Sequence, residues 1–334
     1  MNQPVIRYSC IYLNRSCPRH CEYCSERDAP LKGRELTEPE WEKIITHLDK
    51  LGIKFHLFLG NDCLLLGDEF LKLVQFLKGR RDYALYSTME PRLFGKYKDR
   101  LLPGLYNLSA GIDVLTGTGD IAEKSRDGLA GLTWLREHNI PDCQGTITLG
   151  NHNIDQVEKL VQTLSERGIY VGINVTHWNQ DGGFDFFPEK KYLKDYILER
   201  TPELEQLIKN LVTGIKSGRY LIQNPPEYLE GILEHGIDLS WHCSEPHIIA
   251  IDADGSLRCC GYRKGRALSR YHVLDLGTQK LSIGRYRELW MEDSTECSGC
   301  CWSYAWMAEY TAKTEKYHGD EMFKTHYSPY KERI

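Results

Sequence analysis

Short apolar runs alternate with longer amphipathic segments through the first half of this chain. The short runs are rich in β-branched and aromatic residues and are bounded by turn residues, a pattern typical of buried strands. The longer segments place apolar residues three and four positions apart, which predicts helices with one buried face. Strands are expected at 5–13, 55–59, 83–87, 105–112, 144–149 and 170–175, and helices at 38–51, 69–78, 91–100, 121–138 and 153–167.

This regular alternation of strand and helix predicts an α/β fold built from βα units on a parallel sheet. In such sheets the loops that follow the strands build the active site. The pattern changes near Asp181-Gly182-Gly183, where an aromatic and charged insert begins, and Pro225-Pro226 breaks the chain before a segment dominated by cysteine. We therefore expect two domains, residues 1–224 and residues 225–334.

Composition narrows the classes of function. The 334 residues carry a net charge of −5 with both signs interspersed, which argues against binding to nucleic-acid backbones. The N-terminus shows no basic region followed by an apolar core, and no run of about 18 apolar residues occurs. A soluble cytoplasmic protein that does not enter the membrane is expected. In that reducing setting, the 12 cysteines favour metal binding over disulfides.

Three cysteines follow directly after the first predicted strand. Cys17, Cys21 and Cys24 form a C-x3-C-x2-C triplet. A [4Fe–4S] cluster is usually held by four cysteine thiolates, so a triplet predicts a cluster with one iron open to other ligands. Zinc, a disulfide framework and chance are the alternatives. Zinc usually takes four ligands in paired arms, and disulfide scaffolds belong to short secreted chains.

The triplet, with the aromatic Tyr23 just before its last cysteine, resembles the motif of the radical SAM superfamily. This resemblance implies a partial (β/α)6 barrel with the cluster loop after the first strand. It also implies that the open iron binds the amino and carboxylate groups of S-adenosylmethionine. An electron from a flavodoxin- or ferredoxin-type reductant would then release a 5′-deoxyadenosyl radical.

The same resemblance assigns candidate contacts to the cofactor. Gly60, Asn61 and Asp62 follow the second strand, where related enzymes carry Gly-Gly-Glu-Pro, although such a tripeptide is also common in turns. Gly111 stands where a serine contact is usual, so that contact is missing. Arg126 either pairs with the methionine carboxylate or lies exposed on a helix. Further contacts are expected from Tyr23, Ser87, Thr88 and Asn174, the last of which either faces the barrel mouth or pairs with backbone.

A second group of cysteines marks the C-terminal segment. Asp254-Gly255 predicts a hairpin turn, and thiols on both sides of this hairpin resemble the auxiliary-cluster domains called SPASM and twitch. The resemblance implies a small twitch-like domain of hairpin and helix with one auxiliary [4Fe–4S] cluster, and structural zinc is the alternative. The expected ligands are Cys243, Cys260, Cys297 and Cys300, with Cys259 and Cys301 as alternates, while Cys10, Cys63 and Cys143 are expected to be buried.

These features predict a radical enzyme that takes a hydrogen atom from its substrate and completes an oxidation or a crosslink, with the auxiliary cluster as electron acceptor. Because the first strand is expected almost at the N-terminus, no winged-helix domain that holds a leader peptide is expected, which favours a small metabolite or a short peptide. A peptide maturase that forms a crosslink or an epimer is the alternative reaction. An iron–sulfur electron carrier or scaffold and a zinc-binding module are alternatives of another class. Candidate substrate contacts are Asp113, His177, Asn179 and Arg258.

Overall fold

The computed structural model describes most of the chain. The described residues are 8–24, 33–53, 55–176, 195–238, 240–261, 265–295 and 299–314, together with residues 6, 263 and 297. Two candidate substrate contacts, His177 and Asn179, lie outside the described residues, as does the insert that begins near residue 181.

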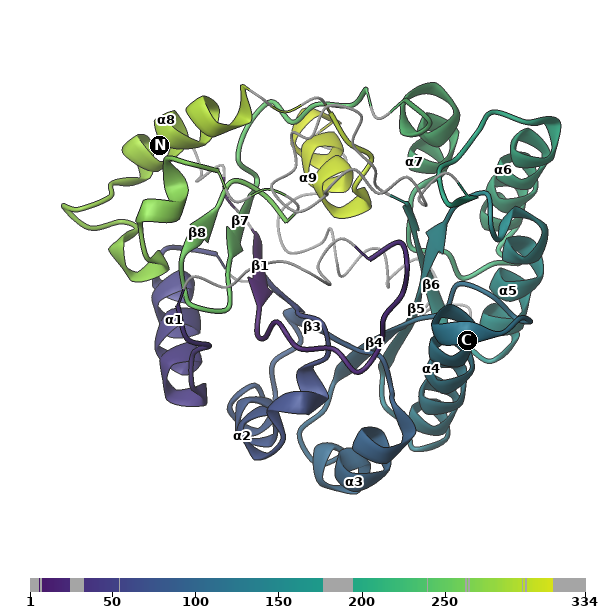
Figure 1. Ribbon diagram of the computed structural model, residues 1–334, viewed down its shortest axis with the longest axis horizontal. Coiled ribbons are helices and arrows are strands. Elements are labelled where there is room, and N and C mark those ends of the chain that lie inside the picture. The colour runs from purple at the N-terminus through teal and green to yellow at the C-terminus, as the bar shows by residue number, and fades with distance from the viewer. Residues whose placement is uncertain are drawn as a thin grey trace.

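One curved sheet of eight strands organises the described chain (Figure 1). The order across the sheet is β6-β5-β4-β3-β2-β1-β7-β8, and every neighbouring pair is parallel except β7 with β8. The predicted α/β class with a parallel sheet is therefore confirmed. The strands are β1 (Tyr8–Tyr12), β2 (Phe55–Leu59), β3 (Tyr83–Ser87), β4 (Asn107–Gly111), β5 (Asp142–Leu149), β6 (Tyr170–Val175), β7 (Ile248–Ile251) and β8 (Leu257–Arg258).

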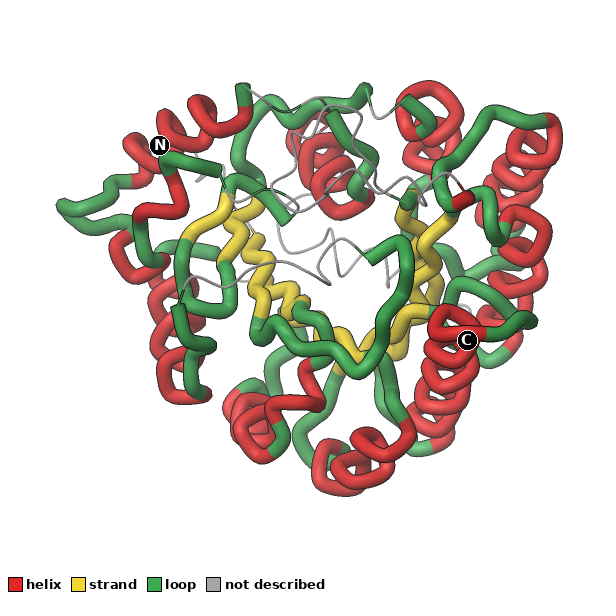
Figure 2. Tube along the Cα trace, in the orientation of Figure 1, coloured by secondary structure: helices red, strands yellow, loops and turns green. Residues whose placement is uncertain are grey.

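Helices α1 to α6 surround the sheet on its outer side, while α9 lies across its open side (Figure 1, Figure 2). Local signals place their ends. The Glu40 carboxylate accepts a 2.9 Å hydrogen bond from the Thr37 N–H at the start of α1, and Gly168, with a φ of 67°, follows α5 as expected. The helices are α1 (Glu38–Lys50), α2 (Asp68–Phe76), α3 (Pro91–Leu101), α4 (Gly119–Glu137), α5 (Ile154–Glu166), α6 (Pro202–Lys216), α7 (Pro226–Gly231), α8 (Ile283–Ser294) and α9 (Ser303–Thr314).

The main hydrophobic core lies between the sheet and the outer helices. Ile44 of α1 and Leu160 of α5 are fully buried there, and burial of such a side chain is worth about 1.5–3 kcal/mol. The cysteines Cys10, Cys63 and Cys143 are buried, as expected. A second cluster on the inner side of the sheet joins Cys10, Tyr12, Leu57, Ala84 and Ala250 to Trp302 and Ala305 at the start of α9.

The cysteine-rich C-terminal segment adds two strands to the same sheet. β7 pairs in parallel with β1, with Tyr8 opposite Ile248, and β8 turns back on β7. The turn contains the predicted Asp254-Gly255, where Gly255 has a φ of 79°, a conformation that favours glycine. The predicted hairpin is therefore present, and it continues the barrel sheet. The division of the chain into domains at residues 224 and 225 stays a prediction.

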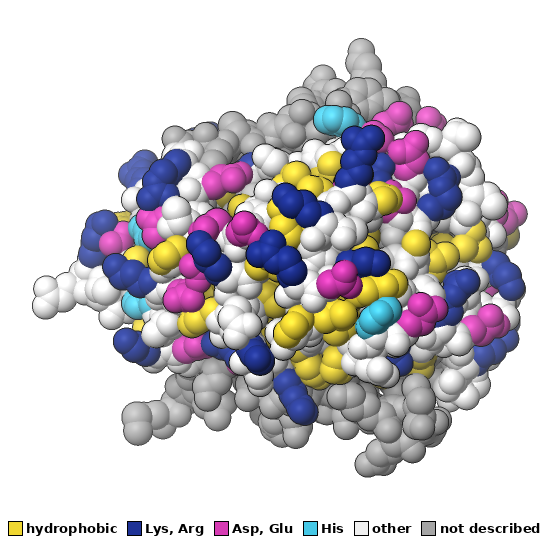
Figure 3. All heavy atoms as spheres, turned by 90° about the horizontal axis from the view of Figure 1, so that it is seen from below, with side chains coloured by type: hydrophobic (Ala, Val, Ile, Leu, Met, Phe, Trp, Pro, Cys, Tyr) yellow, Lys and Arg dark blue, Asp and Glu magenta, His cyan; other side chains and the backbone are white. Residues whose placement is uncertain are grey.

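The described surface mixes charges of both signs. On the face drawn in Figure 3, seen from below relative to Figure 1, basic and acidic side chains are interspersed and apolar side chains lie between them. The large apolar side chains that are clearly exposed among the described residues are Leu65 and Met291, and single exposed residues of this kind are normal. None of the described helices combines the length and the apolar character needed to cross a membrane.

Candidate metal centres and cofactor loop

The first cysteine group lies on the loop that leaves β1. The Cys24 N–H donates to the Cys21 carbonyl at 3.1 Å, which turns the loop, and the Arg19 N–H donates to Cys17 Sγ at 3.4 Å. Burial raises the pKa of Cys17 to about 12, while the Arg19 N–H lowers it and the neighbouring Asp62, Cys24 and Cys21 add to the rise. Burial likewise raises the pKa of Cys21 to about 11. The three thiols are therefore close enough to influence one another, and the raised pKa values keep Cys17 and Cys21 protonated near neutral pH unless a metal binds.

Carboxylates of α4 fasten this loop to the barrel. The Arg19 guanidinium, whose side chain is 9% exposed, contacts Glu123 Oε2 at 3.0 Å and also pairs with Asp127. The His20 N–H donates to Asp120 Oδ2 at 3.1 Å. Because Arg19 and His20 lie between Cys17 and Cys21, the first turns of α4 determine where the cysteine triplet stands.

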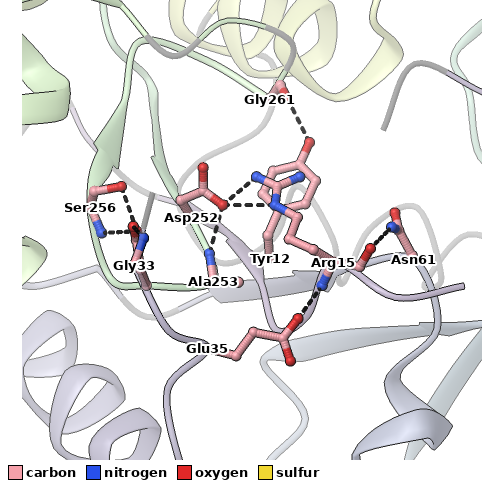
Figure 4. A network of polar contacts seen from close by, with 10 residues as sticks. Tyr12, Arg15, Gly33, Glu35, Asn61, Asp252, Ala253, Ser256 and Gly261 are labelled. Atoms are coloured by element: carbon pink, nitrogen blue, oxygen red, sulfur yellow. Dashed lines mark hydrogen bonds and ion pairs between the residues drawn. The ribbon is translucent and has the colours of Figure 1, made fainter. Parts of the chain in front are cut away.

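The predicted cofactor loop lies against the segment that precedes the triplet. Asn14 Nδ2 donates to the Asp62 carbonyl at 2.7 Å, and Asn61 Nδ2 donates to the Arg15 carbonyl at 2.5 Å (Figure 4). Gly60 has a φ of 148°, and a Cβ there would lie only 2.8 Å from Asn14 Oδ1. A side chain at residue 60 would therefore push the two loops apart.

The carboxylate of Asp62 is turned inward. It is fully buried and accepts hydrogen bonds from the Leu64 N–H at 3.0 Å, Ser87 Oγ at 2.9 Å and the Thr88 N–H at 3.2 Å, as well as from Thr88 Oγ1. Burial raises the pKa of Asp62, and these donors only partly oppose it. Three predicted cofactor contacts thus bond to one another and brace β2 against β3. The Asp62 carboxylate is therefore committed to the protein, and the loop would have to meet a ligand through its other polar groups, such as the backbone carbonyls of Gly60 and Asn61.

A buried ion pair lies beside the aromatic residue of the triplet. Lys124 Nζ contacts Asp113 Oδ2 at 2.5 Å, and the Tyr23 hydroxyl bonds to both groups. Burial by itself would raise the pKa of Asp113, but the Lys124 ammonium overcomes it and the pKa is lowered. The pKa of Lys124 is raised because the attraction of Asp113 exceeds the cost of burial. Both groups stay charged, and Asp113, a candidate substrate contact, is already fully engaged by the protein.

The absence of a serine at residue 111 has a steric reason. A Cβ on Gly111 would lie 2.4 Å from the Tyr86 hydroxyl oxygen and 2.9 Å from Lys124 Nζ. The Lys124 ammonium and the Tyr86 phenol therefore occupy the space that a side chain would need. Arg126, two residues further along α4, is exposed, and within the described part of the chain its Nη1 contacts the Gly117 carbonyl at 3.5 Å. Its expected role toward a carboxylate stays a prediction.

Lys124 was not identified from the sequence. A usable signal exists, because Gly128, four residues further along the same helix, is close to β4, where a Cβ on it would lie 3.0 Å from the Gly111 carbonyl. A lysine on that face must be paired, since burial of an unpaired charge is costly.

The Asn174 side chain bonds to the first residue of α9. Its Oδ1 accepts from the Ser303 N–H at 3.1 Å and also from Ser303 Oγ. The expected pairing with backbone is therefore present, and it ties β6 to the start of α9.

Three rings form a contact that the sequence did not reveal. The ring centroids of His152 and Tyr196 are 4.8 Å apart, and those of Tyr23 and His152 are 5.9 Å apart. The Tyr196 hydroxyl donates to Glu22 Oε2 at 2.7 Å. Burial lowers the pKa of His152, so its ring is neutral near pH 7. The loop after β5 and the segment near residue 196 thereby cover the triplet.

The second cysteine group lines a cavity of about 60 Å³ between β8, α8 and the start of α9. Burial raises the pKa of Cys243 well above its usual range, and Cys300, Cys260 and Cys297 add to the rise. The four expected ligands are thus brought together. Cys259 also lines the cavity, while Cys301 packs in the main hydrophobic core. The walls of the cavity include Trp241, Trp290 and Trp302.

Both groups offer free thiols, the donor type that iron–sulfur clusters take. Within the described ranges, no three His, Cys, Asp or Glu side chains stand close enough to share a single metal ion. Thiolates are the donors that iron–sulfur clusters take, and zinc accepts them as well.

Arg258 directly precedes Cys259 and lies over the ring of Tyr12 on β1. It is fully buried, and its guanidinium carbon is 4.3 Å from the centroid of the Tyr12 ring, while that of Arg15 is 4.6 Å away. Figure 4 shows the Tyr12 ring beside Arg15, which pairs with Asp252. The Tyr12 hydroxyl donates to the Gly261 carbonyl at 2.6 Å. The expected contact of Arg258 with a substrate stays a prediction.

Part of the barrel matches a known protein family. Residues 11–164 match the model of the Radical SAM superfamily. The PqqA peptide cyclase of Bradyrhizobium diazoefficiens is 25% identical over 160 residues, which make up 45% of this chain and 41% of that protein. The chain thus spans less than half the length of this relative.

Solved structures of Streptococcus suis SuiB share the fold. The structure bound to S-adenosylmethionine has a TM-score of 0.58 at 13% identity, over 77% of this chain and 60% of SuiB. The structure bound to the precursor peptide SuiA has a TM-score of 0.58 at 13% identity, over 84% of this chain and 66% of SuiB. At these identities the likeness concerns the fold alone.

Proposed function

Residues 11–164 form a radical SAM domain, and from this premise we propose that the protein cleaves S-adenosylmethionine reductively in order to oxidise or crosslink a peptide. The observation that carries the proposal is the packing of the cysteine triplet loop beside the loop at Gly60–Asp62, at the end of β1 and β2. A [4Fe–4S] cluster at Cys17, Cys21 and Cys24 would supply an open iron site and the electron that cleaves the cofactor to a 5′-deoxyadenosyl radical.

The residues around the triplet would orient the cofactor. Asp62 holds the loop after β2 in place from within, so that the carbonyls of Gly60 and Asn61 can accept hydrogen bonds from an ammonium group. Tyr23 is held by Asp113 and Lys124. His152 and Tyr196 cover this side of the site and help to exclude water.

A second cluster would be held by Cys243, Cys260, Cys297 and Cys300, which line one buried cavity. Closure by four thiolates favours electron transfer over substrate binding. The substrate would lose a hydrogen atom to the radical, one electron to this cluster and one proton to solvent. This sum is a two-electron oxidation, which forms either a double bond or a crosslink.

A peptide is the substrate class that the comparisons favour. The curated relative is a peptide cyclase, and SuiB has been solved with a precursor peptide bound. A small metabolite remains the alternative substrate. A flavodoxin- or ferredoxin-type protein would supply the electron.

The proposal is tested by iron, sulfide and cofactor cleavage after anaerobic purification. The wild type is expected to hold about eight irons, and the Cys17→Ala/Cys21→Ala/Cys24→Ala variant about four. The wild type should release 5′-deoxyadenosine when reduced with S-adenosylmethionine present, and the variant should not. A wild type that holds iron but releases no 5′-deoxyadenosine would instead indicate an electron carrier. Equal release by both proteins would refute the assignment of the triplet.

A further inference from the structure

The side chain of Asn14 carries a buried oxygen that receives no hydrogen bond from any residue within the described ranges. Asn14 is 1% exposed, and its Nδ2 donates to the Asp62 carbonyl at 2.7 Å. Because a carbonyl only accepts, this contact determines which end of the amide is the nitrogen. The Oδ1 atom therefore points away from the Asp62 carbonyl and lies beside Gly60, where a Cβ would be only 2.8 Å from it.

The Asn14 side chain lies on the inner side of the sheet. Leu13 packs in the main hydrophobic core between the sheet and the outer helices, while Tyr12 belongs to the cluster on the inner side. The Leu13 N–H donates to the Leu59 carbonyl at 2.9 Å, so the pairing with β2 continues past the end of β1. Successive side chains of a strand point to opposite faces, which places Asn14 on the same side as Tyr12. The triplet begins three residues later, at Cys17.

The chemistry of this place favours a ligand group that donates hydrogen bonds. An acceptor that is buried without a donor is destabilising, and a ligand that brings a donor removes that cost. The carbonyls of Gly60 and Asn61, which belong to the same pair of loops, are acceptors as well. A carboxylate only accepts and does not fit such a set, whereas an amino group brings N–H donors and does.

We propose that Asn14 Oδ1 accepts a hydrogen bond from the amino group of S-adenosylmethionine, in the role that was expected of the Asp62 carboxylate. The inference rests on the proposed function, which brings the cofactor to these two loops. The Asp62 carboxylate is engaged by Ser87 and Thr88, so another side chain has to supply the acceptor. Asn14 supplies it from the segment that joins β1 to the triplet.

The test compares the dissociation constants of S-adenosylmethionine and of an analogue that lacks only the α-amino group. Anaerobic equilibrium dialysis measures both on full-length protein with oxidised clusters, so that the cofactor is not cleaved. The readout is the ratio of the two constants, because loosening of the loops affects both ligands alike. Asn14→Ala removes the acceptor, and Asn14→Asp keeps an acceptor without the donor to Asp62. Asn61→Ala is the matched control, since it removes a second hydrogen bond between the loops, the one to the Arg15 carbonyl.

Asn14→Ala is expected to lower the preference for S-adenosylmethionine over the analogue about tenfold. Asn14→Asp should keep most of this preference, and Asn61→Ala should leave it unchanged. An unchanged ratio in Asn14→Ala, or an equal loss in Asn14→Asp or Asn61→Ala, overturns the inference. If Asn14→Ala loses its iron, Asn14→Leu decides by the same ratio, and loss of iron from both variants overturns the inference too, because Asn14 then only holds the loop. A wild type that holds iron and does not bind S-adenosylmethionine refutes the proposed function instead.

Discussion

At the scale of single residues, the Lys124 side chain occupies the space that a side chain at residue 111 would need. Lys124 and Tyr86 fill the space above Gly111, and the ion pair with Asp113 compensates the burial of the lysine charge. Removal of one partner from such a pair typically costs about 3–5 kcal/mol, because the other charge is left unpaired. Lys124 also bonds to the Tyr23 hydroxyl. The position of Tyr23 therefore depends on the absence of a side chain at residue 111.

Gly111→Ser is expected to destabilise the protein by about 1–3 kcal/mol, the usual cost of overpacking. The new Cβ would lie 2.4 Å from the Tyr86 hydroxyl oxygen. Denaturant unfolding measures the change. Tyr86→Phe in the same chain should recover part of the loss, since it removes the closest atom. Gly95→Ser is the control, because nothing lies within 4 Å of a Cβ at that position, and an equal loss there would contradict the steric explanation.

At the scale of elements, the first turns of α4 and α1 carry acidic side chains whose surroundings differ. α4 presents Asp120, Glu123 and Asp127 to the cysteine loop. At the start of α1, burial and the neighbouring Glu42 raise the pKa of Glu38 to about 7. Its pKa is ordinary in the unfolded chain, so the folded state binds more protons between about pH 4.5 and pH 7. Ionisation of Glu38 therefore opposes folding as the pH rises through that window.

Glu38→Gln is expected to remove this pH dependence. Between about pH 5 and pH 8 the wild type should lose about 1–2 °C of thermal midpoint relative to the variant, as the raised carboxyl ionises. Thermal unfolding followed by circular dichroism at both pH values measures the difference. Glu137→Gln, at an exposed position on α4, is the control. Parallel pH profiles for wild type and Glu38→Gln would show that Glu38 does not titrate in this window.

At the scale of the whole molecule, the two cysteine groups belong to one sheet. β1 leads into the triplet and also pairs with β7, whose hairpin leads to Cys259-Cys260. The Tyr12 hydroxyl crosses from β1 to the Gly261 carbonyl. The barrel and the auxiliary site are therefore joined by backbone pairing and by this buried hydrogen bond.

Tyr12→Phe is expected to cost about 1–3 kcal/mol of unfolding free energy, because the Gly261 carbonyl loses its buried donor. Iron held by the C-terminal cysteines should also be lost faster to a chelator. Tyr97→Phe is the control, since that side chain is similarly buried and is not part of this link. Equal stability and equal iron loss in Tyr12→Phe and wild type would show that the two sites are held together without this bond.

Much of the fold and part of the candidate site could be predicted from the chain alone. The bounds of β2, β3 and β6 agree with the expected ranges, because alternation and turn residues act over a few positions. The hairpin at Asp254-Gly255 could be predicted in the same way, because two adjacent residues carry its turn signal. The spacing of Cys17, Cys21 and Cys24 also needed no tertiary information, since one loop carries all three thiols.

Only the tertiary structure decided which polar groups are used inside the protein and where the second cysteine group lies. Asp62 was expected to face a ligand, yet Leu64 on its own loop and Ser87 and Thr88 at the end of β3 supply the donors that turn it inward. Lys124 is buried because Asp113, eleven residues away, comes from the end of another element. Residues 243 and 300 meet because β7 joins β1 and α9 packs inside the sheet. Local patterns determine elements, whereas pairing of charges and thiols depends on long-range packing that a one-dimensional pattern does not contain.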